Sequence, residues 1–284
     1  MKVYSVDLYD YFKVDKPQGA RANLCCYVKE NTPEVCEDRK NPAMLVIPGG
    51  GYGMVSDREG EPIAVNFYSR GFSSFVLTYS VAPVRFPYQL VEAVMAMAYM
   101  RKNAKELSID ENMISAIGFS AGGHLCAMLG SISDAEEVKE VFKSPVFTRP
   151  NAIILGYPVI TCGGKGHFGS FDNLCGNDED LKKKLDVNNL VNKNSSPAFI
   201  WATYNDEIVP IQNSLIVASA YEREGVNFSI HVWGKGPHGL STASKDVFGK
   251  ANSYTNLGFA STSVSSWLDL AEEWLAEIGI TIQE

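Results

Sequence analysis

Short apolar runs alternate with amphipathic segments along most of the chain, and this alternation predicts its secondary structure. Runs of apolar residues too short for helices indicate buried strands. They occupy residues 43–47, 74–79, 113–117, 152–155 and 198–202. A helix is predicted to begin at Pro62. Helical spacing of apolar residues predicts further helices at 88–107, 121–130, 211–224 and 263–278.

The order of these elements predicts an α/β fold. Residues 226–233 alternate between apolar and polar side chains, as expected of a strand with one covered face. Two further strands, 3–8 and 22–28, precede the first helix and are expected to form an antiparallel edge. Strands that alternate with helices favour a mostly parallel central sheet with helices on both faces.

The domain organisation follows from the absence of repeats and linkers. One α/β domain over 1–284 is expected. Residues 160–196 interrupt the pattern with a polar stretch rich in Gly and Asn, and 178–185 within it has the character of a short helix. We interpret 160–196 as a short, cap-like insertion.

The composition and the net charge of the chain indicate which classes of binding partner to expect. The chain has a formal net charge of −8, which disfavours binding to nucleic acid or to anionic membranes. Its 6 cysteines form no Cys-x-x-Cys pair and no zinc-like cluster, so free thiols in a reducing compartment are expected. The N-terminal residues carry no signal-peptide pattern, and the prediction is therefore a cytoplasmic protein.

The strongest chemical signal is Gly-Phe-Ser-Ala-Gly at 118–122, which lies between a predicted strand and a predicted helix. In a Gly-x-Ser-x-Gly turn the serine sits on a strained backbone and is pushed out above the sheet. Ser120 is therefore the candidate nucleophile. The alternative is a serine that only caps the helix.

The base and the acid are expected after the nucleophile, with the acid first. Of the 4 histidines, His238 lies in the glycine-rich loop 234–240 that follows the last predicted strand. Asp206 lies in a loop at the end of the strand 198–202, and Glu207 is its neighbouring competitor. We predict that Asp206 orients His238 and that His238 takes the proton of Ser120.

Backbone donors for a tetrahedral intermediate are expected from two places. One is Ala121, directly after the nucleophile, and the other is the loop Pro-Gly-Gly-Gly-Tyr at 48–52, with Gly50 and Gly51 as the donors. A dinucleotide-binding glycine loop is the alternative reading. Ser56 stands where the third glycine of that fingerprint should be, which argues against it.

Together the segments PGGGY at 48–52, IGFSAGGHL at 117–125, DEIVP at 206–210 and GPHGL at 236–240 resemble the bacterial α/β-hydrolase carbohydrate esterases of the acetyl-xylan-esterase-like or feruloyl-esterase-like type. The resemblance covers about residues 43–278. It implies an α/β-hydrolase fold and a cofactor-free serine hydrolase for short acyl esters, with acetyl groups on sugars as the expected substrate.

Two positions depart from this resemblance. Pro48 stands where related esterases have histidine, which implies a differently braced glycine loop, and Phe119 replaces the aspartate of the lipase branch. The absence of an N-terminal pair of cap helices suggests an open site. Tyr52 and Phe119 are candidate substrate contacts, with packing as the alternative for Tyr52, whereas His124 is expected to pack within its helix.

The function predicted from these residues is a serine carboxylic ester hydrolase that works through an acyl-enzyme. Two alternatives remain: an amide-cleaving hydrolase such as an arylformamidase or peptidase on the same triad, and a non-catalytic binding protein on the same scaffold. The expected partner is a small-molecule or oligosaccharide ester, with no cofactor, metal, nucleic acid or membrane. A homo-oligomer is compatible with the sequence.

Overall fold

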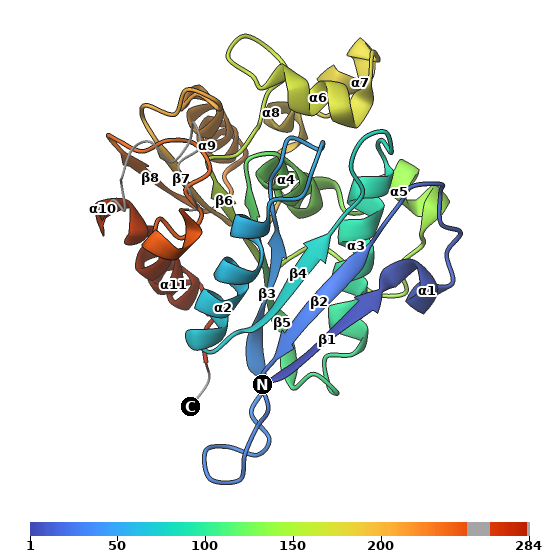
Figure 1. Ribbon diagram of the computed structural model, residues 1–284, viewed down its shortest axis with the longest axis vertical. Coiled ribbons are helices and arrows are strands. Elements are labelled where there is room, and N and C mark those ends of the chain that lie inside the picture. The colour runs from blue at the N-terminus through green and yellow to red at the C-terminus, as the bar shows by residue number, and fades with distance from the viewer. Residues whose placement is uncertain (249–261, 283–284) are drawn as a thin grey trace.

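The computed structural model describes residues 1–248 and 262–282 and is built around one eight-stranded sheet (Figure 1). In spatial order its strands are β1 (Lys2–Asp7), β2 (Asn23–Val28), β4 (Ser73–Thr78), β3 (Asn41–Ile47), β5 (Ile109–Phe119), β6 (Ala152–Gly156), β7 (Ala198–Thr203) and β8 (Phe228–Trp233). β1 pairs with β2 and β2 with β4 in antiparallel fashion, and every later pair is parallel. The predicted parallel sheet with an antiparallel N-terminal edge is confirmed.

Helices cover both faces of the sheet. One apolar core packs against α1 (Leu8–Phe12), α3 (Tyr88–Lys102), α4 (Ala121–Ile132) and α9 (Gln212–Glu224). The other core packs against α2 (Glu61–Ser69) and α11 (Trp267–Glu277). The remaining helical segments are short: α5 (Glu136–Val141), α6 (Phe168–Cys175), α7 (Glu179–Lys184), α8 (Val187–Leu190), α10 (Thr262–Ser265) and the 3₁₀ turns Asp57–Glu59 and Lys245–Val247.

Two predicted boundaries differ from the structure for local reasons. The strand expected at 3–8 ends at Asp7, because the Asp7 carboxylate accepts hydrogen bonds from the N–H groups of Tyr9 and Asp10 and so caps α1. The helix expected to reach 107 ends at Lys102, where the Asn103 side chain donates to the carbonyl of Tyr99. Capping by polar side chains decides both ends.

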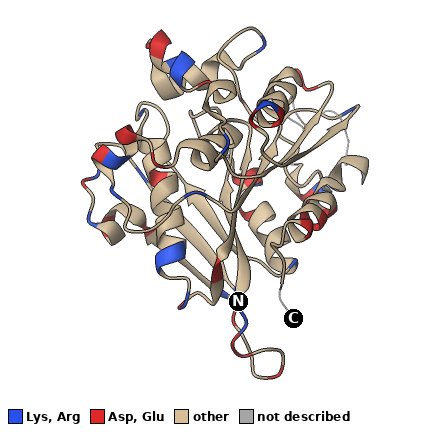
Figure 2. Ribbon diagram, turned by 180° about the vertical axis from the view of Figure 1, so that it is seen from behind, with Lys and Arg blue, Asp and Glu red and all other residues tan. Residues whose placement is uncertain are grey.

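The predicted insertion forms α6, α7 and α8, which lie above the end of the molecule where the parallel strands terminate (Figure 1). α7 carries acidic residues in its first turn and the three lysines 182–184 in its last, and charges of both signs are interspersed around the fold (Figure 2). Lys182 pairs with Asp172 and Glu179, so the positive charge of this lysine is balanced on the surface.

The parallel strands determine where a site can form. β3, β5, β6, β7 and β8 all run in one direction, so the loops that follow them meet at one edge of the sheet. In the part of the chain that the structure describes, no helix is long and apolar enough to cross a membrane.

Candidate active site

Ser120 lies at the point where β5 turns into α4, in a conformation that few residues adopt. Its φ is 53° and its ψ is −121°, in a region that is strained for a residue with a side chain. The backbone is held there because Ser120 N–H donates to the carbonyl of Gly156, while the Ser120 carbonyl accepts from the N–H of Val159. The strained serine turn predicted from the sequence is present.

The glycines on either side of Ser120 allow this turn to form against the neighbouring strand. A Cβ on Gly122 would overlap the carbonyl oxygens of Ile47 and Pro48 at the end of β3. A Cβ on Gly118 would overlap the carbonyl of Gly122. Only glycine lets α4 begin this close to β3, and this contact brings the loop after β3 next to the nucleophile.

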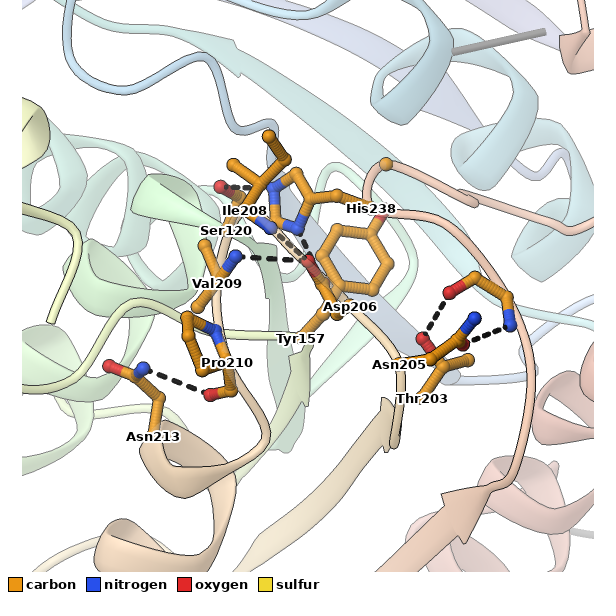
Figure 3. A network of polar contacts seen from close by, with 12 residues as sticks. Ser120, Tyr157, Thr203, Asn205, Asp206, Ile208, Val209, Pro210, Asn213 and His238 are labelled. Atoms are coloured by element: carbon orange, nitrogen blue, oxygen red, sulfur yellow. Dashed lines mark hydrogen bonds and ion pairs between the residues drawn. The ribbon is translucent and has the colours of Figure 1, made fainter. Parts of the chain in front are cut away.

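Three side chains from different loops converge at this turn (Figure 3). His238 Nε2 lies 2.9 Å from Ser120 Oγ, and His238 Nδ1 lies 2.7 Å from Asp206 Oδ2. The other carboxylate oxygen, Asp206 Oδ1, accepts from the N–H groups of Ile208 and Val209, each at 2.9 Å. Glu207 is exposed, so it is Asp206 that the fold brings to the imidazole.

The hydrogen bonds fix the direction of proton movement. A carboxylate only accepts, so His238 Nδ1 donates to Asp206, and in the neutral ring Nε2 is left as the acceptor. Ser120 Oγ therefore donates its hydrogen bond to Nε2. This is the arrangement in which histidine can remove the serine proton while the aspartate stabilises the imidazolium that forms.

The loop after β3 offers backbone donors beside Ser120. Gly50 and Gly51 have φ values of 121° and 63°, which suit glycine, and the Gly50 carbonyl accepts from the N–H groups of Gly53 and Met54. Within residues 1–248 and 262–282, the N–H groups of Gly50 and Gly51 donate to no protein atom. Ala121 is the first residue of α4, where helix N–H groups lack an intrahelical acceptor.

These groups open onto a cavity of about 330 Å³ at the end of the sheet where the strand-end loops meet. This volume suits a small ligand. The cavity is lined by Gly50, Gly51, Met54, Ser56, Arg58, Glu59, Ser120, His167, Ile208, His238 and Gly239.

Comparison with solved structures identifies the family. The crystal structure of an acetyl ester-xyloside bifunctional hydrolase from Caldicellulosiruptor lactoaceticus is 32% identical, with a TM-score of 0.82, and the match covers 98% of this chain and 97% of that one. A carboxylesterase from Lactobacillus plantarum WCFS1 is 27% identical over 100% of both chains, also with a TM-score of 0.82. The chain belongs to the α/β-hydrolase esterases.

Sequence comparisons agree with this family. The BD-FAE family model matches residues 31–160 of this α/β-hydrolase. Endo-1,4-beta-xylanase B from Butyrivibrio fibrisolvens is 37% identical over 87% of the chain, and an acetylxylan esterase from Xylanibacter ruminicola is 28% identical over 81%. The chain spans 38% and 46% of the lengths of these two relatives.

The two candidate substrate contacts are both placed in the core of this α/β-hydrolase, which corrects the expectation. Phe119 is fully buried, because the pleat of β5 turns its ring away from the loops and against Tyr157, Trp201 and Trp267. Tyr52 is 1% exposed and packs against the ring of Tyr79. Neither side chain lines the cavity.

His124 explains why Tyr52 is buried. The Tyr52 hydroxyl and His124 Nδ1 are 2.8 Å apart, and His124 Nε2 lies 2.9 Å from the carbonyl of Leu185 in the insertion. Because a carbonyl only accepts, Nε2 donates and Nδ1 accepts from Tyr52. His124 is buried and does not line the cavity, as expected of a packed residue, but its hydrogen bonds reach outside its helix and join α4 to the glycine loop and to the insertion.

Pro48, the first residue of the loop 48–52, accepts a hydrogen bond at its carbonyl. Tyr79 donates its hydroxyl proton to the Pro48 carbonyl at 2.7 Å. The glycine loop is thus anchored by the residue that follows β4.

His167 and Glu59 line the cavity, although the sequence pattern singled out neither residue for the site. His167 precedes α6, and its Nδ1 accepts from the N–H of Ser170, so Nε2 carries the proton of the neutral ring. Burial, and then the nearby His238, lower the pKa of His167 and keep it uncharged. A His-x-x-Ser capping pattern was its only local signal; Glu59 had none, because a loop glutamate is normally exposed.

We predict that His124 makes stability fall at acidic pH. Burial lowers the pKa of His124 from its ordinary 6.5 to about 4. Between these values the unfolded chain binds the proton and the folded chain does not, so stability is complete above pH 6.5 and declines toward pH 4 by about 1.4 kcal/mol per pH unit.

The measurement is urea unfolding of the wild type and of His124→Gln at several values between pH 4.5 and 8. Glutamine keeps a donor for the Leu185 carbonyl but does not titrate. The free energy of unfolding of the variant should therefore depend less steeply on pH in this window, by the amount that the uptake of about one proton contributes. Equal slopes in the two proteins would show that His124 does not contribute to the acid sensitivity.

Proposed function

We propose that this α/β-hydrolase is a serine carboxylesterase that removes short acyl groups, above all acetyl, from carbohydrate esters. The observation that carries the proposal is the unbroken chain of hydrogen bonds from Ser120 through His238 to Asp206. It supports the role of Ser120 as nucleophile, His238 as base and Asp206 as the orienting acid.

The reaction follows from this geometry. Ser120 Oγ attacks the ester carbonyl while His238 Nε2 accepts its proton, and the carbonyl oxygen becomes negatively charged next to the N–H groups of Gly50, Gly51 and Ala121. The imidazolium then gives the proton to the departing alcohol, which leaves an acetyl-serine. A water oxygen then attacks the acyl carbon while His238 Nε2 removes one of the water protons. The imidazolium returns this proton to Ser120 Oγ as the bond between Oγ and the acyl carbon breaks, and acetate is released.

The proposed length of the acyl group and the proposed alcohol part of the substrate are supported by different observations. The cavity of about 330 Å³ suits a short acyl group together with part of its alcohol. The carbohydrate assignment is supported by relatives whose names state acetylxylan and acetyl ester-xyloside activity. Neither of the comparisons favours the amide-cleaving alternative, and the complete triad argues against a binding protein without activity.

We place this activity in a reducing compartment, the cytoplasm, as part of the proposal. All six cysteines are free thiols, and Cys26, Cys126 and Cys175 are buried. Burial raises the pKa of these three thiols, which makes them poor partners for disulfide exchange.

Replacement of the nucleophile tests the reaction directly. The wild type should release acetate from acetylated xylo-oligosaccharides and hydrolyse p-nitrophenyl acetate faster than the octanoate ester. Ser120→Ala should reduce turnover by at least about 10⁴-fold, because no other group can form the acyl-enzyme. Ser69→Ala, on an exposed turn of α2, is the matched control and should keep full activity. A wild type that releases no acetate and no p-nitrophenol contradicts the proposal.

A second experiment separates the two neighbouring acids. Asp206→Asn should lower kcat by about 10⁴-fold, because asparagine presents an N–H to His238 Nδ1 and favours the wrong tautomer. Glu207→Gln is the control, since this exposed side chain lies next to Asp206 without touching His238, and it should retain activity. Comparable losses in the two variants would show that Asp206 has no special role.

A further inference from the structure

Glu59 is a buried carboxylate at the cavity that the ester chemistry does not use. It ends the 3₁₀ turn Asp57–Glu59, is 3% exposed and lines the same cavity as Ser120 and His238. Its two oxygens accept from two different loops: Oε2 from the N–H of Gly49 at 2.8 Å and Oε1 from the hydroxyl of Tyr157 at 2.7 Å. A buried carboxylate costs several kcal/mol of desolvation unless it is well paired, so its presence requires a reason.

The hydrogen bond from Gly49 to Glu59 holds the glycine loop, residues 48–52, in place. Gly49 is the first of the three glycines, and its N–H donates to Glu59, whereas those of Gly50 and Gly51 donate to no protein atom among the residues that the structure describes. A Cβ on Gly49 would come within 2.8 Å of Glu59 Oε2 and 3.0 Å of Ser120 Cβ, so the carboxylate and the nucleophile flank the same backbone atom. Glu59 therefore fixes the peptide plane from which the two free donors extend.

The hydrogen bond from Tyr157 connects Glu59 to the base loop, the segment 234–241 that carries His238. The Tyr157 hydroxyl also accepts from the N–H of Ser241 at 2.9 Å, and the Ser241 carbonyl accepts from Trp267 Nε1 at 3.0 Å. The Tyr157 ring lies edge-on to the imidazole of His238, with 5.0 Å between ring centroids. Burial and the charge of Glu59 raise the pKa of Tyr157, so its hydroxyl stays protonated and keeps donating to the carboxylate.

We propose that Glu59 is a positioning residue that sets the oxyanion donors and the catalytic histidine relative to each other by bonding to both loops at once. The inference rests on the proposed esterase function. Glu59 touches neither the acyl group nor the alcohol in this account. It acts through Gly49 on the donors and through Tyr157 on His238, which makes its effect specific to the charged intermediate.

The test is the kinetics of Glu59→Gln on p-nitrophenyl acetate. Gly49 and Tyr157 donate to different oxygens of Glu59, and glutamine replaces one of these two oxygens by an NH₂ group, so only one of the two positions still offers an acceptor. We expect kcat to fall by at least about tenfold, toward the 10²–10³ range that the loss of one oxyanion donor costs. KM should stay within about threefold, because interactions that strengthen only in the transition state change kcat and not ground-state binding.

Glu92→Gln is the matched control for replacing a buried glutamate that accepts hydrogen bonds from two other residues. Glu92 is fully buried in α3, accepts from Tyr9 and Ser80, and lies outside the cavity. Both variants should change the melting temperature, but only Glu59→Gln should lose turnover. Should Glu59→Gln fail to fold, Tyr157→Phe serves as the second variant. It keeps the aromatic ring and the hydrogen bond from Gly49 to Glu59, and it removes the hydroxyl that connects Glu59 to Ser241. Its kcat should fall severalfold, with KM unchanged.

The outcomes separate this inference from the proposed function. A wild type without esterase activity overturns the function itself. An active wild type with kcat unchanged in Glu59→Gln or, if that variant does not fold, in Tyr157→Phe overturns the positioning role alone. A loss carried by KM, or an equal loss of turnover in Glu92→Gln, overturns it as well, because a general effect on packing or binding would then explain the result.

Discussion

The site depends on one steric constraint, the contact between the start of α4 and the end of β3. Gly122 packs against the carbonyls of Ile47 and Pro48 so closely that no side chain fits between them. This contact places the glycine loop beside Ser120, whose φ is 53°. The Ser120 hydroxyl and the loop that carries Gly50 and Gly51 are therefore adjacent as a result of backbone packing, before any polar side chain contributes. The strain at Ser120 is sustained because Gly156, at the end of β6, accepts from the Ser120 N–H, and Val159, in the turn after β6, donates to the Ser120 carbonyl.

Buried polar side chains then join the loops that this packing brings together. Glu59 spans the glycine loop and Tyr157, His124 joins Tyr52 to the insertion, and Asp206 is held by two backbone donors while it binds His238. Buried hydrogen-bond networks of this kind stabilise the fold only when every polar atom in them has a hydrogen-bond partner. Preorganisation of this type allows an ester intermediate to be stabilised without reorganisation at the moment of reaction. The insertion takes part in it, since it supplies His167 to the cavity wall and accepts the bond from His124.

The sequence predicted the framework because its signals are local. Apolar periodicity placed the strands, and the Gly-x-Ser-x-Gly turn together with the order of acid and base led to Ser120, Asp206 and His238. Predictions about Tyr52 and Phe119 misplaced these residues, because adjacency to a motif does not say which way a side chain points. The pleat of β5 directs Phe119 into the core, and Tyr52 is drawn inward by a histidine that is distant in sequence. Glu59 could not be recognised from local pattern, since its importance comes from hydrogen bonds to Gly49 and Tyr157, which follow other strands. The local pattern around His167 indicated a helix cap and not a place in the cavity wall.

The central claim is that the fold activates one hydroxyl, that of Ser120, and the most direct measurement is covalent labelling with a fluorophosphonate followed by peptide mass mapping. The reagent reacts with a serine only where a base and an oxyanion site act on the same oxygen. The account predicts a single adduct on the peptide that contains Ser120 and a sharp loss of labelling when His238 is replaced by alanine. Labelling at another serine, or labelling of Ser120 that does not depend on His238, would contradict it.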